Sequence, residues 1–165
     1  MGGVGKTSLA IAYAHRFRGL YAGVCWCPAE TRTGLLNALA GLAVTLGAAT
    51  AEEADVEKAA EAALRRLAEQ RATWLLVFDN VAAPDAIADL LPSAGARVLI
   101  TSRFSDWSEL ADEIALDVLP LAEAIRSFRA ARDAAMLRGR RSLPRHSVSY
   151  RSLLIMQRPT ASARK

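Results

Sequence analysis

The sequence has few cysteines and histidines and no long apolar run. Of its 165 residues two are Cys and two are His, although hydrophobic residues make up 52%. No stretch of 18 or more apolar residues exists, so neither a membrane-spanning helix nor a secretory signal is expected. The length suffices for one domain with a sizeable core. These features together predict a cytoplasmic protein without a membrane partner.

The two cysteines form a C-x-C pair at Cys25 and Cys27. On a strand, residues two apart project from the same face, which would suit half of a metal site. No further Cys is present, and His15 and His146 lie far away along the chain. We therefore interpret the pair as ordinary buried thiols in a reducing cytosol.

Acidic residues nearly vanish from the last 40 positions. Residues 1–125 contain 10 Lys and Arg against 16 Asp and Glu, whereas residues 126–165 contain 11 against one. This change predicts two parts: a mildly acidic domain over 1–125 and a basic, largely unstructured tail over 126–165. Reading a GC-rich gene out of frame produces such a switch, and a true basic arm is the alternative. One short apolar patch, residues 153–156, offers a makeshift strand.

A glycine-rich segment at the start of the chain carries the strongest motif. It matches all but the first position of G-x-x-x-x-G-K-[ST], and the strand that normally feeds such a loop is not present before it. The candidate phosphate-binding residues are Gly2, Gly3, Val4, Gly5, Lys6, Thr7 and Ser8. Backbone N–H groups of such a loop surround phosphate oxygens. Lys6 would reach the β- and γ-phosphates, and the Thr7 hydroxyl would bind Mg²⁺.

The first 125 residues alternate between helical and strand patterns, which predicts an α/β fold. Helices are expected at 7–18, 33–46 and 84–91, together with one that a capping box at Thr50 and Glu53 opens and that runs to about Arg71. Strands are expected at 21–28, 73–78 and 96–101, and a strand plus turn at 113–121.

The strand at 73–78 ends in Asp79 and Asn80. Several apolar residues followed by Asp form the pattern that delivers a carboxylate to Mg²⁺ at the end of a parallel strand. The pattern is weak alone, but it gains weight because it lies about 70 residues after the glycine-rich segment. We predict that Asp79 is catalytic and binds the metal with Thr7. Arg103 follows the next buried strand and is placed to contact a γ-phosphate, also in a catalytic role.

The segments MGGVGKTSLA, LLVFDNV, ARVLITSR and IALDVLPL, in this order, resemble the NB-ARC nucleotide-binding domain of the STAND class of signal-transduction ATPases. The resemblance covers about residues 1–125 and is incomplete at both ends. It implies a three-layer P-loop NTPase core with a parallel sheet, here lacking the strand before the phosphate loop. That strand would lie between those at 96–101 and 113–118, so its loss would leave two unpaired edges.

The resemblance also implies a function. The chain would be the ATP- and ADP-binding module of a nucleotide switch that uses Mg²⁺, and full-length members self-associate and carry effector or repeat domains. Hydrolysis is doubted here, because Asn80 stands where hydrolytic relatives often have an acid, and an amide cannot accept a proton at neutral pH.

The sequence leaves three alternative hypotheses open: an inert remnant of a disrupted gene, a small-molecule kinase with the same loop motif, and a nucleic-acid-binding protein that uses its arginine-rich tail. The tail has only Phe128 and Tyr150 for base stacking, so nucleic acid is not the expected partner. The strand end at Thr101–Arg103 favours the signalling ATPase over the kinase.

Overall fold

The structure, a computed structural model, describes residues 5–52, 55–104, 107, 110–116 and 152–157. The elements in chain order, with η marking a 3₁₀ helix, are α1 (Lys6–Phe17), η1 (Arg18–Leu20), β1 (Val24–Pro28), α2 (Arg32–Thr45), α3 (Val56–Glu69), β2 (Trp74–Val81), η2 (Ala88–Leu90), β3 (Ala96–Ser102), β4 (Ala111–Leu116) and β5 (Ser152–Gln157). Helices and strands alternate along most of this order, so the fold is α/β, as the sequence predicts.

The strands form one sheet in the order β1-β2-β3-β5-β4. The pairs β1–β2 and β2–β3 are parallel, whereas β5 is antiparallel to both β3 and β4. It follows that β1, β2, β3 and β4 all run in one direction and β5 runs against them. The carboxyl ends of β2 and β3 therefore lie at the same edge of the sheet, where parallel-sheet proteins place their ligand sites.

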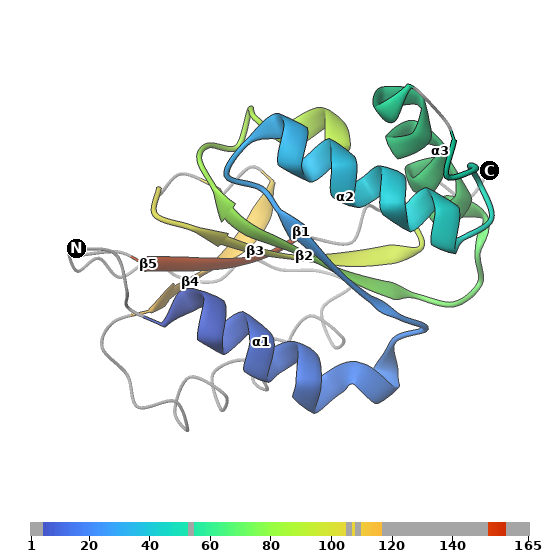
Figure 1. The fold of residues 1–165 in the computed structure, drawn as a ribbon. Helices are drawn as coiled ribbons and strands as arrows, with labels where there is room; N and C mark the ends of the chain where they lie inside the picture. The colour runs from blue at the N-terminus through green and yellow to red at the C-terminus, as the bar shows by residue number, and fades with distance from the viewer. Residues whose placement is uncertain (1–4, 53–54, 105–106, 108–109, 117–151, 158–165) are drawn as a thin grey trace, which may run out of the picture.

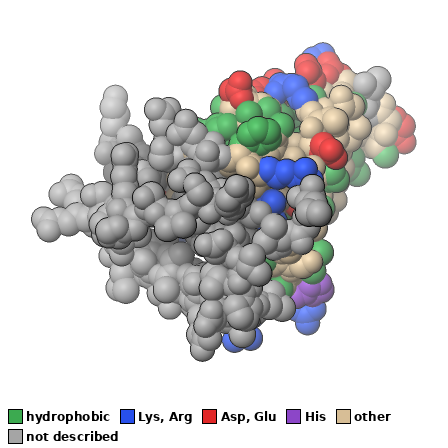
Figure 2. Space-filling view, turned by 90° about the vertical axis from the view of Figure 1, so that its left-hand side faces the viewer, with side chains coloured by type: hydrophobic (Ala, Val, Ile, Leu, Met, Phe, Trp, Pro, Cys, Tyr) green, Lys and Arg blue, Asp and Glu red, His purple; other side chains and the backbone are tan. Residues whose placement is uncertain are grey.

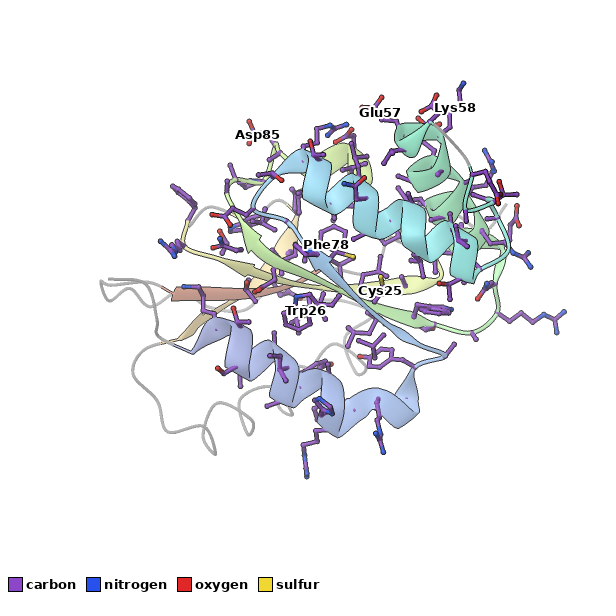
Figure 3. The ribbon with its side chains drawn as sticks, in the orientation of Figure 1. Cys25, Trp26, Glu57, Lys58, Phe78 and Asp85 are labelled. Atoms are coloured by element: carbon purple, nitrogen blue, oxygen red, sulfur yellow. The ribbon has the colours of Figure 1, made fainter. Side chains whose placement is uncertain are left out.

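Helices cover both faces of the sheet, giving three layers (Figure 1). On one face, α1 packs against Leu75, Val77 and Leu99. On the other, α2 and α3 pack against the alternate side chains of the same strands, including Leu76 and Phe78. Figure 3 shows this division, with Phe78 and Cys25 directed towards α2 and Trp26 towards α1. The apolar run of β2 is thus buried on both faces, as its sequence indicates.

The start of α3 differs from the prediction. The helix begins at Val56, because the Asp55 side chain caps it by accepting the Lys58 N–H at 3.1 Å. The capping box expected at Thr50 and Glu53 is therefore wrong, at least for Thr50, which lies before the helix in a segment without helical structure. Asp55 directly precedes Val56, which packs against the core, so Asp55 rather than Thr50 is in position to cap the helix.

The other local predictions hold within a few residues. α1, α2, β1 and β3 each occupy the expected segment, and β2 extends beyond Phe78 to Val81. The helix expected at 84–91 is shorter, a single 3₁₀ turn at η2. The expected strand plus turn at 113–121 begins earlier, at Ala111, and residues after 116 lie outside the described part.

The sheet requires a correction at β5. The predicted sheet is wholly parallel with two unpaired edges between β3 and β4, but β5 lies between them and pairs with both. β5 comes from the short apolar patch at 153–156. The expectation that the tail has no fixed fold is therefore wrong for residues 152–157. The remainder of the tail lies outside the described residues.

The described surface carries charges of both signs. Seen from the left-hand side of Figure 1, Lys and Arg side chains lie among Asp and Glu side chains, and much of that view belongs to residues not described (Figure 2). Within the described residues, no helix is long and apolar enough to cross a membrane.

Candidate functional site

The candidate site begins at Gly5, immediately before α1. Gly5 has φ 77° and caps the helix, and its carbonyl accepts the Leu9 N–H at 2.8 Å. A Cβ on Gly5 would meet nothing within 4 Å, so the requirement for glycine is conformational. The first turn of α1 then contains Lys6, Thr7 and Ser8. Gly2, Gly3 and Val4, predicted as phosphate-binding residues, lie outside the described residues.

The structure brings Thr7 and Asp79 together across 72 residues of sequence. The Thr7 hydroxyl donates to Oδ1 of Asp79 at 3.0 Å and lies 3.3 Å from Oδ2. Thr7 belongs to the first turn of α1, and Asp79 to the carboxyl-terminal part of β2. The two residues that the sequence predicts as metal ligands are thus in direct contact. Ser8 is exposed on the same turn.

A second hydroxyl group, that of Thr101 on β3, joins this contact. Thr101 donates to Oδ1 of Asp79 at 2.6 Å and accepts the main-chain N–H of Asn80 at 2.8 Å. Asn80 has φ 65°, and the β2–β3 register is irregular between Phe78 and Val81. Asn tolerates this left-handed conformation better than most residues. The irregular backbone at the end of β2 therefore belongs to the candidate site.

The residue next to Thr101, Ser102, holds the turn that leads to Arg103. Its buried hydroxyl donates to the Val81 carbonyl at 2.8 Å and accepts the Phe104 N–H at 3.1 Å. Arg103 itself is exposed, just beyond the end of β3. It lies at the same edge of the sheet as Asp79, as the sequence predicts.

Lys6 interacts with both charged groups of this edge. Partial burial and the nearby positive charge of Arg103 lower the pKa of Lys6 below its ordinary value of 10.5, whereas Asp79 acts in the opposite direction. The two cations are therefore close enough to repel each other. A phosphate between them would relieve this repulsion, because it supplies negative charge to both.

The oxygen donors of the site suit Mg²⁺. The Thr7 hydroxyl and the Asp79 carboxylate are hard ligands, and the described residues contain no group of three or more His, Cys, Asp or Glu that could hold a metal ion. Mg²⁺ is typically bound by one or two protein oxygens, with phosphate and water completing its shell. The residues present therefore fit Mg²⁺ held together with a phosphate ligand.

Two residues of this cluster, Thr101 and Ser102, belong to a motif that the sequence analysis used, but it predicted no contact or chemical role for either of them. Thr101 and Ser102 are buried, with exposed fractions of 1% and 0%, and both donate to groups of β2. The signal that would have found them is the polar end of an otherwise apolar strand, next to the strand that carries Asp79. Such positions place hydroxyl groups in a core, where they need partners.

The C-x-C pair lies apart from this cluster, on β1. Both side chains project to the α2 face, as strand alternation predicts, with the two Sγ atoms 3.7 Å apart. Cys27 is fully buried, and its hydrogen bond with Cys25 together with burial raises the pKa of its thiol far above the usual range. The Cys27 thiol is thus held in its protonated form.

Comparison of the chain with protein-family models, with curated proteins and with solved structures found no match.

Proposed function

We propose that this chain binds a nucleoside di- or triphosphate together with Mg²⁺, as a P-loop NTPase core of the NB-ARC type acting as an ADP/ATP switch. The hydrogen bond between Thr7 and Asp79 carries the proposal. Two motifs recognised separately in the sequence supply these residues, and the fold places them in contact. The parallel arrangement of β2 and β3, with α1 starting at their carboxyl edge, supports it.

Each residue has a part in this binding. The N-terminus of α1 and the charge of Lys6 attract the phosphates, and Arg103 approaches them from the end of β3. Thr7 and Asp79 hold Mg²⁺, which neutralises phosphate charge when bound. Because Thr7 donates its proton to Asp79, its oxygen lone pairs stay available for the metal.

Nucleotide hydrolysis is expected to be slow or absent. Asn80 occupies the position after Asp79, and its amide cannot take a proton from an attacking water. We expect no phosphate release above background when purified protein is incubated with ATP and Mg²⁺. Steady release that disappears in Lys6→Ala would show that another group activates the water.

The test of binding is calorimetric titration with ADP and ATP in the presence of Mg²⁺. Lys6→Ala should abolish the binding signal, whereas Lys58→Ala should leave it unchanged. Lys58 is a matched control, because it is exposed at the start of α3 and forms an ion pair with Asp55. A wild-type protein that binds neither nucleotide, or equal binding by wild type and Lys6→Ala, would overturn the proposal.

A further inference from the structure

The hydroxyl group of Thr101 has an unusually constrained environment. Thr101 is 1% exposed, and its side-chain oxygen lies between two groups of β2, the Asp79 carboxylate and the Asn80 N–H. A main-chain N–H can only donate, so the Thr101 oxygen is the acceptor of that bond. The hydroxyl proton is therefore free to point at Oδ1 of Asp79. The direction of both hydrogen bonds is fixed by this arrangement.

The backbone conformation of Asn80 maintains the hydrogen bond from its N–H to the Thr101 oxygen. Its positive φ of 65° coincides with the irregular register between Phe78 and Val81. Residues other than glycine adopt this strained conformation only where the surrounding contacts hold them in it. Here the Asn80 N–H, which cannot follow the regular ladder, finds the Thr101 oxygen at 2.8 Å.

The hydrogen bond from the Thr101 hydroxyl to Oδ1 restricts how the Asp79 carboxylate can rotate. Oδ1 accepts the 2.6 Å bond from Thr101 and the 3.0 Å bond from Thr7, whereas Oδ2 has the longer 3.3 Å contact with Thr7. One oxygen is thus held by hydroxyl groups from two elements, α1 and β3. Rotation of the carboxylate is therefore restricted, and Oδ2, which has the weaker contact, is the oxygen more available to a metal or to its water shell.

We propose that Thr101 is a positioning residue that fixes the Asp79 carboxylate, and through it the Mg²⁺ site, with the Asn80 N–H fixing Thr101 in turn. The statement about Asp79 concerns the ligand-free protein, and the statement about Mg²⁺ rests on the proposed function. Hydrogen bonds from neutral hydroxyls to a carboxylate are short and strong, which gives Thr101 the means to do this.

Two substitutions separate the hydroxyl from the shape of the side chain. Thr101→Val keeps the volume and removes the hydroxyl, whereas Thr101→Ser keeps the hydroxyl and removes a methyl group. In the ligand-free protein, the carboxyl ¹³C resonance of Asp79 should move in Thr101→Val and stay near its wild-type position in Thr101→Ser. An unmoved resonance in Thr101→Val overturns the inference, whatever the protein binds.

The metal is tested by nucleotide binding over a range of Mg²⁺ concentrations and in EDTA. Thr101→Val should raise the Mg²⁺ concentration at half-maximal effect by about tenfold, as expected for one lost hydrogen bond to a charged group. Its affinity in EDTA should equal that of wild type, and Thr101→Ser should restore the Mg²⁺ response. An equal loss with and without Mg²⁺ would mean a general structural role and would overturn the inference.

The two proposals fail in different ways. If wild type binds no nucleotide, the proposed function is wrong, and the Asp79 resonance alone then decides whether Thr101 positions the carboxylate. If wild type binds nucleotide and Lys6→Ala does not, but Thr101→Val has the wild-type Mg²⁺ response, the proposed function stands and Thr101 does not position the metal site.

Discussion

At the scale of single residues, the charge of Lys6 is expected to lower the stability of the ligand-free protein. Burial and the charge of Arg103 both disfavour its protonated form in the ligand-free protein, and Asp79 offsets them only in part, so its pKa is lowered. The unfolded chain therefore binds more protons than the folded one between this lowered pKa and the ordinary value of 10.5. Over that window, stability rises with pH.

This cost predicts that Lys6→Met stabilises the ligand-free protein at neutral pH while abolishing nucleotide binding. The difference in Tm between the variant and wild type should shrink as the pH rises through the lowered pKa of Lys6. Thermal unfolding of both proteins over a pH series measures it. Lys58→Met is the control and should bring no stabilisation, because Lys58 is exposed and paired with Asp55. A Lys6→Met protein less stable than wild type at neutral pH would contradict the prediction.

At the scale of elements, patterns over a few residues predict most of the fold. The apolar run before Asp79 predicts the strand, since a strand buried on two faces needs such a run. Because Asp79 comes directly after the run, the same pattern predicts a carboxylate at the end of the strand. The first residue of α3, in contrast, could not be predicted from such a pattern. Thr50 and Asp55 are both good caps, and the choice depends on which helical start lets Ala60 and Ala63 pack in the core with α2.

The contact between Gly95 and α3 is another feature that local patterns do not reveal. Gly95 precedes β3 with φ 74°, and a Cβ there would overlap the Leu67 carbonyl at the end of α3. Its own carbonyl accepts the Trp74 N–H at 2.9 Å, at the start of β2. The backbone of this turn thus meets a helix and two strands in one place.

We expect Gly95→Ala to destabilise the protein by about 2 kcal/mol or more, because both the conformation and the space exclude a side chain. Gly41→Ala is the matched control. Gly41 lies within α2 with nothing within 4 Å of a Cβ, so alanine should stabilise by about 0.5–1 kcal/mol. Urea unfolding of the three proteins gives both values. Equal effects of the two substitutions would show that the turn is not held against α3.

At the scale of the whole molecule, the order of the strands is the feature that the sequence does not predict. The pairs Leu99–Met156 and Ile114–Leu154 join segments far apart along the chain. Such pairing depends on the closure of long loops and on which sheet edges are left to be filled, and neither is written in a local pattern. The prediction of the candidate site does not depend on the pairing of β5, because the described site residues lie on or next to α1, β2 and β3.

β5 is expected to hold β4 to the rest of the sheet. It pairs with β3 on one side and β4 on the other, and β3 and β4 are not neighbours. In a strand with two neighbours, each main-chain N–H faces one of them, so a proline within β5 removes one ladder hydrogen bond and places its ring where a donor is needed.

Leu154→Pro should therefore destabilise the protein by about 2–3 kcal/mol more than Leu154→Ala. The alanine variant shortens the same side chain but keeps the N–H, so the difference between the two reports the backbone alone. Urea unfolding measures this difference. Hydrogen exchange should also show faster exchange of the β4 amides in the proline variant, because β5 is the strand that joins β4 to β3 in the sheet, while the amides of β1 and β2 stay protected. If both variants unfold at the same urea concentration, β5 does not join the two parts of the sheet.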